Sequence, residues 1–142
     1  MNGEHNSGNR VRQMIECLDV VLDVAGLEQD CGARAMLAVA LCDQLDSRLG
    51  GERRAAVEAA RDFWISGEVA EYRKWFGAYS AMLDEKRLLD PLDRLVWSAL
   101  ARSGGLDSFT GESLVLEAVD AGLDPDEISI ALSSVVPGYG NP

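Results

Sequence analysis

The chain contains 142 residues, of which 24 are acidic and 13 are basic, so its formal net charge is −11 at pH 7. That length suits one domain with a substantial core and is too short for two ordinary domains. An apolar fraction of 47% is too high for a disordered acidic chain. The net negative charge argues against binding to nucleic acid or to anionic membranes, because it repels their phosphate groups.

The N-terminal segment 1–9 is polar and rich in glycine and asparagine, so we expect a disordered tail there. It lacks the apolar core of a signal peptide. No later stretch approaches the roughly 20 apolar residues that are needed to cross a membrane. We therefore expect a cytoplasmic protein that does not insert into a membrane.

Two helices are predicted in the first third of the chain. Apolar residues recur at helical spacing from Val11 to Ala25, where a glycine follows as a stop. The same spacing continues over residues 31–49 and ends at Gly50 and Gly51. These two segments are therefore predicted to be separate amphipathic helices.

Three more helices are predicted in the middle of the chain. Strong helix formers occupy residues 52–64, and the helical period resumes over 69–83 after an interruption at 66–68. Asp90 and Pro91 stand in the order of an N-cap and a first-turn proline, which is typical of a helix start.

The C-terminal segment contains two further helix signals. Thr110 is a candidate cap for a sixth helix. Asp124, followed by a proline, begins a seventh helix, and Glu127 completes a capping box with it. The glycine- and proline-rich residues 137–142 are expected to form a flexible tail.

No segment combines sustained apolar and polar alternation with β-branched residues, so no strand is predicted. The sequence therefore predicts an all-α fold, a single-domain bundle of about six to seven helices over residues 10–136. The residues that we expect in its core are Leu18, Leu22, Leu37, Leu41, Phe63, Trp64, Trp75, Leu95, Trp97, Leu114 and Ile128.

The sequence offers little catalytic machinery. His5 is the only histidine and lies in the predicted tail, so the folded part has no histidine to act as a base or a metal ligand. Cys17, Cys31 and Cys42 form no C-x-x-C pair and indicate neither a disulfide framework nor a zinc site. Phosphate-binding glycine motifs are absent from the sequence. The sequence favours a function without catalysis and predicts no cofactor.

One enzymatic alternative depends on carboxylates. Glu16, Asp19 and Asp23 share one side of the first predicted helix, and Asp43 and Asp46 lie one turn apart in the second. They could hold Mg²⁺ or Ca²⁺ if the two helices face each other, although a solvated helix face shows the same pattern. No calcium-binding loop accompanies them. We predict no metal site, and a carboxylate-dependent enzyme with a divalent metal stays open as an alternative.

The last two predicted helices match the spacing of DNA-binding helix-turn-helix units at Ala118, Gly122 and Ile128. DNA readers contact phosphates through basic residues, but the second helix begins with Asp124, and no lysine or arginine follows Arg102. We predict two helices packed on the core and no nucleic-acid partner.

The aromatic residues between 61 and 79 could stack single-stranded bases, but they recur at helical spacing, which is typical of a packed face. A ring that stays exposed beside Arg73 is a candidate anchor for a protein partner, because Trp, Tyr and Arg dominate interface hot spots. Trp75 is the candidate ring.

Residues 34–45 (RAMLAVALCDQL) and 53–68 (RRAAVEAARDFWISGE) carry a family resemblance. This part of the chain resembles helical bacterial immunity proteins of polymorphic toxin systems, in which an alanine-rich helix precedes an Arg-x-x-Ala-x-x-Ala-like helix that ends in a Trp and a Gly-Glu. The resemblance implies a non-enzymatic protein that binds and blocks a cognate toxin. It identifies no functional residue.

The distribution of charge points to the candidate binding surface. Residues 103–142 hold seven carboxylates and neither lysine nor arginine, so they should attract a basic partner. We expect a small acidic protein-binding module, an immunity-type inhibitor of a basic toxin or enzyme. The alternatives are the divalent-metal enzyme and an acidic secretion chaperone or adaptor, which an exposed apolar groove and a homodimer would favour. The candidate partner-binding residues are Asp107, Glu112, Glu117, Asp120, Asp124, Asp126, Glu127, Arg73 and Trp75.

Overall fold

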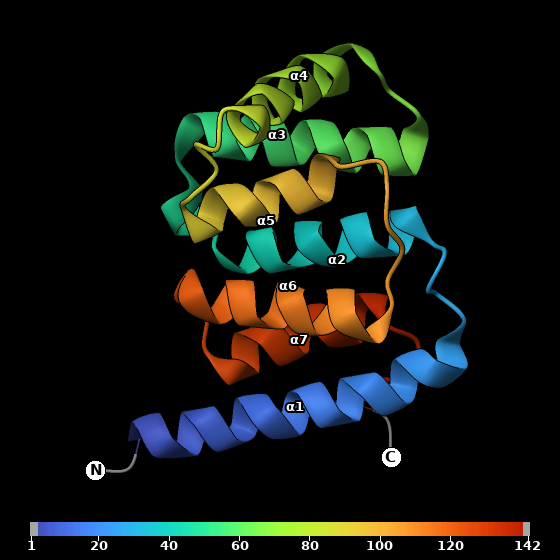
Figure 1. Cartoon of the computed structure of the whole chain (residues 1–142), viewed down its shortest axis with the longest axis vertical. Helices are drawn as coiled ribbons and strands as arrows, with labels where there is room; N and C mark the ends of the chain where they lie inside the picture. Colours follow the sequence, from blue (N-terminus) through green and yellow to red (C-terminus); the bar gives the residue numbers. More distant parts are fainter. Residues whose placement is uncertain (1–2, 141–142) are drawn as a thin grey trace.

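The structure, a computed structural model, describes residues 3–140 and contains only helices in that range (Figure 1). The predicted all-α fold of six to seven helices is confirmed. The helices are α1 (Gly3–Ala25), α2 (Cys31–Gln44), α3 (Asp46–Ser66), α4 (Ala70–Asp84), α5 (Pro91–Leu100), α6 (Ser108–Asp120) and α7 (Pro125–Val135).

Helix α2 lies at the centre of a layered stack (Figure 1). It contacts α3 and α5 on one side and α6 and α7 on the other. Helix α1 packs on α6 and α7 at one end of the stack, and α4 packs on α3 and α5 at the other. Surfaces on α1 and on α4 are therefore at opposite ends of the molecule.

The core is built mainly from aliphatic residues, and α4 contributes the buried tyrosines Tyr72 and Tyr79 to it. The aliphatic part of the predicted core is buried, whereas the four aromatic residues of that prediction are half-buried. Large rings at the edges of α3, α4 and α5 keep part of their surface in water, and such rings are rarely buried completely. The buried members are Leu18, Leu22, Leu37, Leu41, Leu95, Leu114 and Ile128, and the half-buried ones are Phe63, Trp64, Trp75 and Trp97.

Aspartates start four of the helices. Each accepts a backbone hydrogen bond within the first turn, at 2.7–2.9 Å, which satisfies an N–H group that has no partner in the helix. The prediction that Thr110 caps α6 is wrong, because the cap is Asp107, three residues earlier, which accepts from the Thr110 N–H. The four caps are Asp30, Asp90, Asp107 and Asp124.

The second predicted helix does not continue over 31–49. Helix α2 ends at Gln44, and residues 46–49 belong to α3, which bends at Gly50 with a φ of 74°. Leu45 and Leu49 are nevertheless buried, so the apolar spacing continues across the break. A glycine tolerates this φ, whereas other residues would be strained.

Residues 3–9, in the first predicted tail, are helical, and Tyr139, in the second, is buried. Helix α1 begins at Gly3, since adding residues to an existing helix avoids the cost of nucleation. Near the other end, Tyr139 is buried in the same core cluster as Met14, and its N–H donates to the carbonyl of Val136 at 3.2 Å. Residues 1–2 and 141–142 lie outside the described residues.

Candidate partner-binding surface

Three of the candidate carboxylates cap the N-termini of α6 and α7. Asp107 caps α6, and Asp124 and Glu127 form the capping box that the sequence predicts for α7. In that box, Asp124 accepts from the Glu127 N–H at 2.9 Å, and Glu127 accepts from the Asp124 N–H at 3.0 Å. A carboxylate at a helix N-terminus is also stabilised by the helix dipole. These groups have a structural role whether or not a partner binds.

Two further candidates are paired with arginines of other helices. Glu117 of α6 lies 3.1 Å from Arg94 of α5, and Asp126 of α7 pairs with Arg10 of α1. Glu112 and Asp120 are exposed and have no ion-pair partner within residues 8–140, whose side chains the structure describes. On α6, Glu112 and Asp120 therefore carry exposed charge that neither an arginine nor a helix cap in the described part of the chain engages.

Arg73 and Trp75 lie on α4, so the structure does not bring them together with the C-terminal carboxylates (Figure 1). Arg73 is exposed, and Trp75 is half-buried with Lys74 Nζ at 4.9 Å from its ring centroid. Trp75 lines a depression of about 440 Å³ between α3, α4 and α5, together with Leu49 and Met82. The two residues are candidates for a separate contact at the α4 end.

Internal bonds join Arg53, Tyr79 and Asp93 on the polar side of this depression. Asp93 accepts from Arg53 Nε at 2.8 Å and from the hydroxyl of Tyr79 at 3.2 Å, and Arg53 also reaches Asp90 at 3.2 Å. Burial, followed by the charge of Asp93, raises the pKa of Tyr79. A carboxylate that already accepts these bonds links α3, α4 and α5 and is poorly placed to act as a catalytic base.

The raised pKa of Tyr79 predicts alkaline destabilisation. The folded protein retains the Tyr79 proton where the unfolded chain, with a pKa of 10, loses it. The resulting stability is complete below pH 10 and is lost as the pH rises through the folded pKa. Between about pH 9 and about pH 11, the free energy of unfolding in urea should fall less for Tyr79→Phe than for the wild type. Equal slopes would contradict the buried hydroxyl.

The carboxylates considered for a metal site do not converge. Helix α1 packs on α6 and α7 and has no contact with α2, while Asp43 pairs with Arg61 and Asp46 with Arg54. Among residues 3–140, no group of three or more His, Cys, Asp and Glu residues is placed to hold a metal ion. The geometry that the divalent-metal alternative requires is therefore not formed. Burial also raises the pKa of the Cys42 thiol to about 12, which makes it a poor nucleophile at neutral pH.

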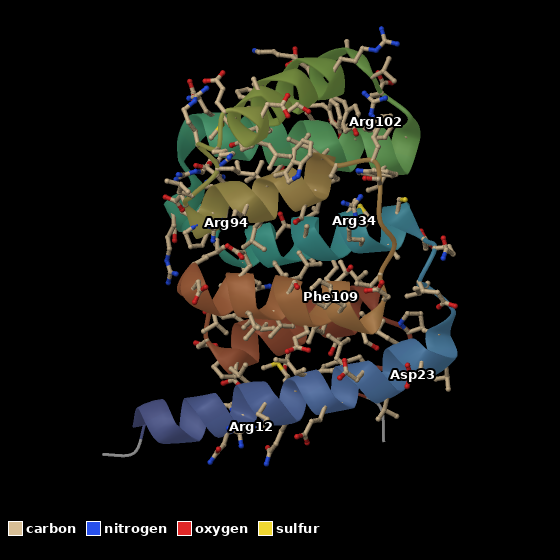
Figure 2. All side chains as sticks on the ribbon, in the orientation of Figure 1. Arg12, Asp23, Arg34, Arg94, Arg102 and Phe109 are labelled. Atoms are coloured by element: carbon tan, nitrogen blue, oxygen red, sulfur yellow. The ribbon has the colours of Figure 1, made fainter. Side chains whose placement is uncertain are left out.

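Three side chains from different helices bind the carbonyl groups at the C-terminal end of α5. Trp64 Nε1 donates to Ala99 O at 2.8 Å, the Tyr72 hydroxyl donates to Leu100 O, and Arg34 donates to Ala101 O. Figure 2 labels Arg34 near this end of α5. We call these three donors, Arg34, Trp64 and Tyr72, the α5 clasp. Arg34 is the one buried charged residue among those described, and the negative end of the helix dipole compensates its charge.

The residues that carry the immunity-protein resemblance have clear packing roles. Trp64 belongs to the α5 clasp, and Gly67 ends α3 in a left-handed conformation with a φ of 76°. Both features satisfy backbone groups at helix ends. These packing roles explain Trp64 and Gly67 without requiring a protein partner.

A groove between α1 and α6 was not predicted from the sequence. It has a volume of about 300 Å³, and we call it the α1–α6 groove. Phe109, near the start of α6, is 80% exposed, although its residue type is usually buried (Figure 2). Glu112 is the one candidate site residue that lines the groove. The lining residues are Gly8, Val11, Arg12, Ile15, Glu16, Glu112 and Leu116.

Comparison with known proteins gives no match to a family model, to a characterised protein or to a solved structure. Within residues 3–140, every helix is too short or too polar to span a bilayer. The functional argument therefore depends on the surface itself. Uncompensated carboxylates next to exposed apolar side chains can bind a protein.

Proposed function

We propose that this chain is a small acidic protein-binding module that acts as an immunity-type inhibitor of a basic toxin or enzyme. The observation that carries the proposal is the uneven charge, because residues 103–142 contain no basic side chain. Glu112 and Asp120 of this segment are exposed and lack an ion-pair partner within residues 8–140. The resemblance of residues 34–68 to immunity proteins supports the same function.

Inhibition in this proposal is a matter of binding alone. The acidic surface attracts the basic face of the toxin and raises the association rate, and a few apolar anchors slow dissociation. The bound module then covers the basic surface that the toxin needs for its own substrate. The cytoplasm, where such a toxin would act, is the proposed compartment.

Affinity capture from the native cell lysate, at low and at high salt, tests the proposal. We expect one basic protein that is retained at low salt and lost at high salt, because exposed charges are screened. Glu112→Gln with Asp120→Asn should reduce its capture, whereas Glu68→Gln with Glu71→Gln, which removes the same charge near α4, should not. Capture of nothing, or of a partner whose binding is independent of salt, would contradict an electrostatic inhibitor.

An acidic secretion chaperone or adaptor is the second candidate function. A mostly apolar groove of about 490 Å³ between α2, α3 and the end of α7 favours it, with Met36, Trp64 and Val135 among the lining residues. A secretion chaperone would combine such a groove with a homodimer. Light scattering of the purified chain distinguishes the two functions, because a dimer would support the chaperone and a monomer the inhibitor.

A further inference from the structure

We propose that the α1–α6 groove binds one amphipathic basic helix of the partner. This inference rests on the proposed function and specifies its binding site. The groove combines an apolar floor with carboxylates on both sides, and this combination fits a helix that carries apolar residues on one face and lysines or arginines beside them.

Helices α1 and α6, which carry the groove, approach closely at Gly111. A Cβ atom at Gly111 would lie 2.8 Å from Leu22 Cδ1 and 3.2 Å from Leu18 Cδ2, so the missing side chain allows this approach. Val11 and Ile15 of α1 are half-buried beside the contact.

Large apolar side chains extend from the floor into solvent. On α6, Phe109 is 80% exposed and Leu116, two turns later, is 45% exposed, so they share one face of the helix. Val119 is exposed one turn beyond Leu116. Together with Ile15, which lines the groove, they form an apolar strip that a partner helix would cover.

Among the described residues that line the groove, Arg12 is the one basic residue, and the carboxylates around it outnumber it, so the net negative charge favours a basic occupant. Glu16, Asp19 and Asp23 follow each other at spacings of three and four on α1, and Glu112 lies across the groove on α6. None of these carboxylates has an ion-pair partner within residues 8–140. A second copy of the chain would place like charges together, which disfavours it as the occupant.

The length of the groove limits the size of the occupant. On α1, the lining residues and the carboxylates Glu16, Asp19 and Asp23 extend over residues 8–23. This range corresponds to about 22 Å along the helix axis. A partner helix of about 15 residues, or four turns, covers that distance. Its apolar residues should recur at spacings of three and four, so that they meet Ile15, Phe109 and Leu116 in turn.

A fluorescein-labelled synthetic helix of about 15 leucines and lysines, patterned to be amphipathic, is the probe for this groove. Fluorescence anisotropy at low salt measures its affinity for the full chain. Phe109→Ser with Leu116→Ser, and separately Glu16→Gln with Glu112→Gln, should each weaken binding by about tenfold. The matched controls near α4, Ile65→Ser and Glu68→Gln with Glu71→Gln, should change it by less than about twofold. These side chains are exposed or partly exposed, so circular dichroism should show unchanged folding.

Three results would overturn the groove assignment. First, the groove variants and the control variants could weaken peptide binding equally. Second, a scrambled peptide of the same composition could bind as tightly as the amphipathic one. Third, the groove variants could convert a dimer of the chain into a monomer. The first two would indicate binding by overall charge, which leaves the proposed function standing. The third would show that a second copy occupies the groove. The proposed function fails separately, if the lysate contains no basic protein that is captured in a salt-dependent way.

Discussion

Gly105→Ala is expected to lower the free energy of unfolding by about 3 kcal/mol, because the new Cβ atom would overlap the backbone of a neighbouring loop. It would lie 2.1 Å from the carbonyl oxygen of Glu28, 2.5 Å from its carbonyl carbon and 2.7 Å from the nitrogen of Asp30. Backbone atoms cannot rotate away, so the two loops must separate. Separation would break the bond from Leu106 N–H to Leu27 O, at 2.9 Å, and expose the buried Leu106 side chain.

Urea unfolding followed by far-UV circular dichroism measures this loss. The matched control is Gly77→Ala in the interior of α4, where a Cβ atom would have no heavy atom within 4 Å. There the substitution should raise the free energy of unfolding by about 0.5–1 kcal/mol, because alanine favours a helix. If Gly105→Ala were as stable as the wild type, the close approach of the two loops would be refuted.

Local signals in the sequence were sufficient to predict most helices. Asp90 and Asp124 start α5 and α7 where predicted, because a cap and the proline after it act within one turn. Gly50 interrupts the helical backbone with a positive φ where predicted, but the earlier break at Leu45 was missed, because the apolar spacing continues across it. Local patterns thus define the elements better than their junctions.

The contacts between helices could not be predicted in this way. The α5 clasp joins α5 to residues 28 to 67 positions away in the chain, and helical spacing contains no information about which helices meet. Arg34 shows the consequence, because an arginine in an alanine-rich segment gives no sign that it will be buried. The approach of Gly105 to residue 28 is of the same kind.

The candidate binding surface was predicted only in part. The acidic character of residues 103–142 can be read from their composition. The capping box can be predicted because Asp124 and Glu127 are three residues apart in the sequence. The pairing of Glu117 with Arg94 and of Asp126 with Arg10 depends on how the helices pack. For the same reason, the sequence could not show that α1 lies beside α6, which places Glu16 across a groove from Glu112.

Tyr72→Ala is expected to lower the free energy of unfolding by about 4 kcal/mol, because it removes both a buried ring and a member of the α5 clasp. The ring of Tyr72 stacks on Phe63 with centroids 3.8 Å apart and lies 5.8 Å from the ring of Phe76. Its hydroxyl donates to Leu100 O at the end of α5. Truncation would therefore leave a cavity between α3 and α4 and a carbonyl group without its donor.

Tyr72→Phe separates the two contributions, because it keeps the ring and removes the hydroxyl. Its expected loss of about 1–2 kcal/mol is the cost of leaving the Leu100 carbonyl unsatisfied. Arg73→Ala is the control, because this neighbouring side chain of α4 is exposed. Its loss should stay below about 0.5 kcal/mol. If Tyr72→Phe were as stable in urea as the wild type, the hydroxyl bond to Leu100 O would not stabilise α5. The lower stability of Tyr72→Ala would then come from lost packing alone.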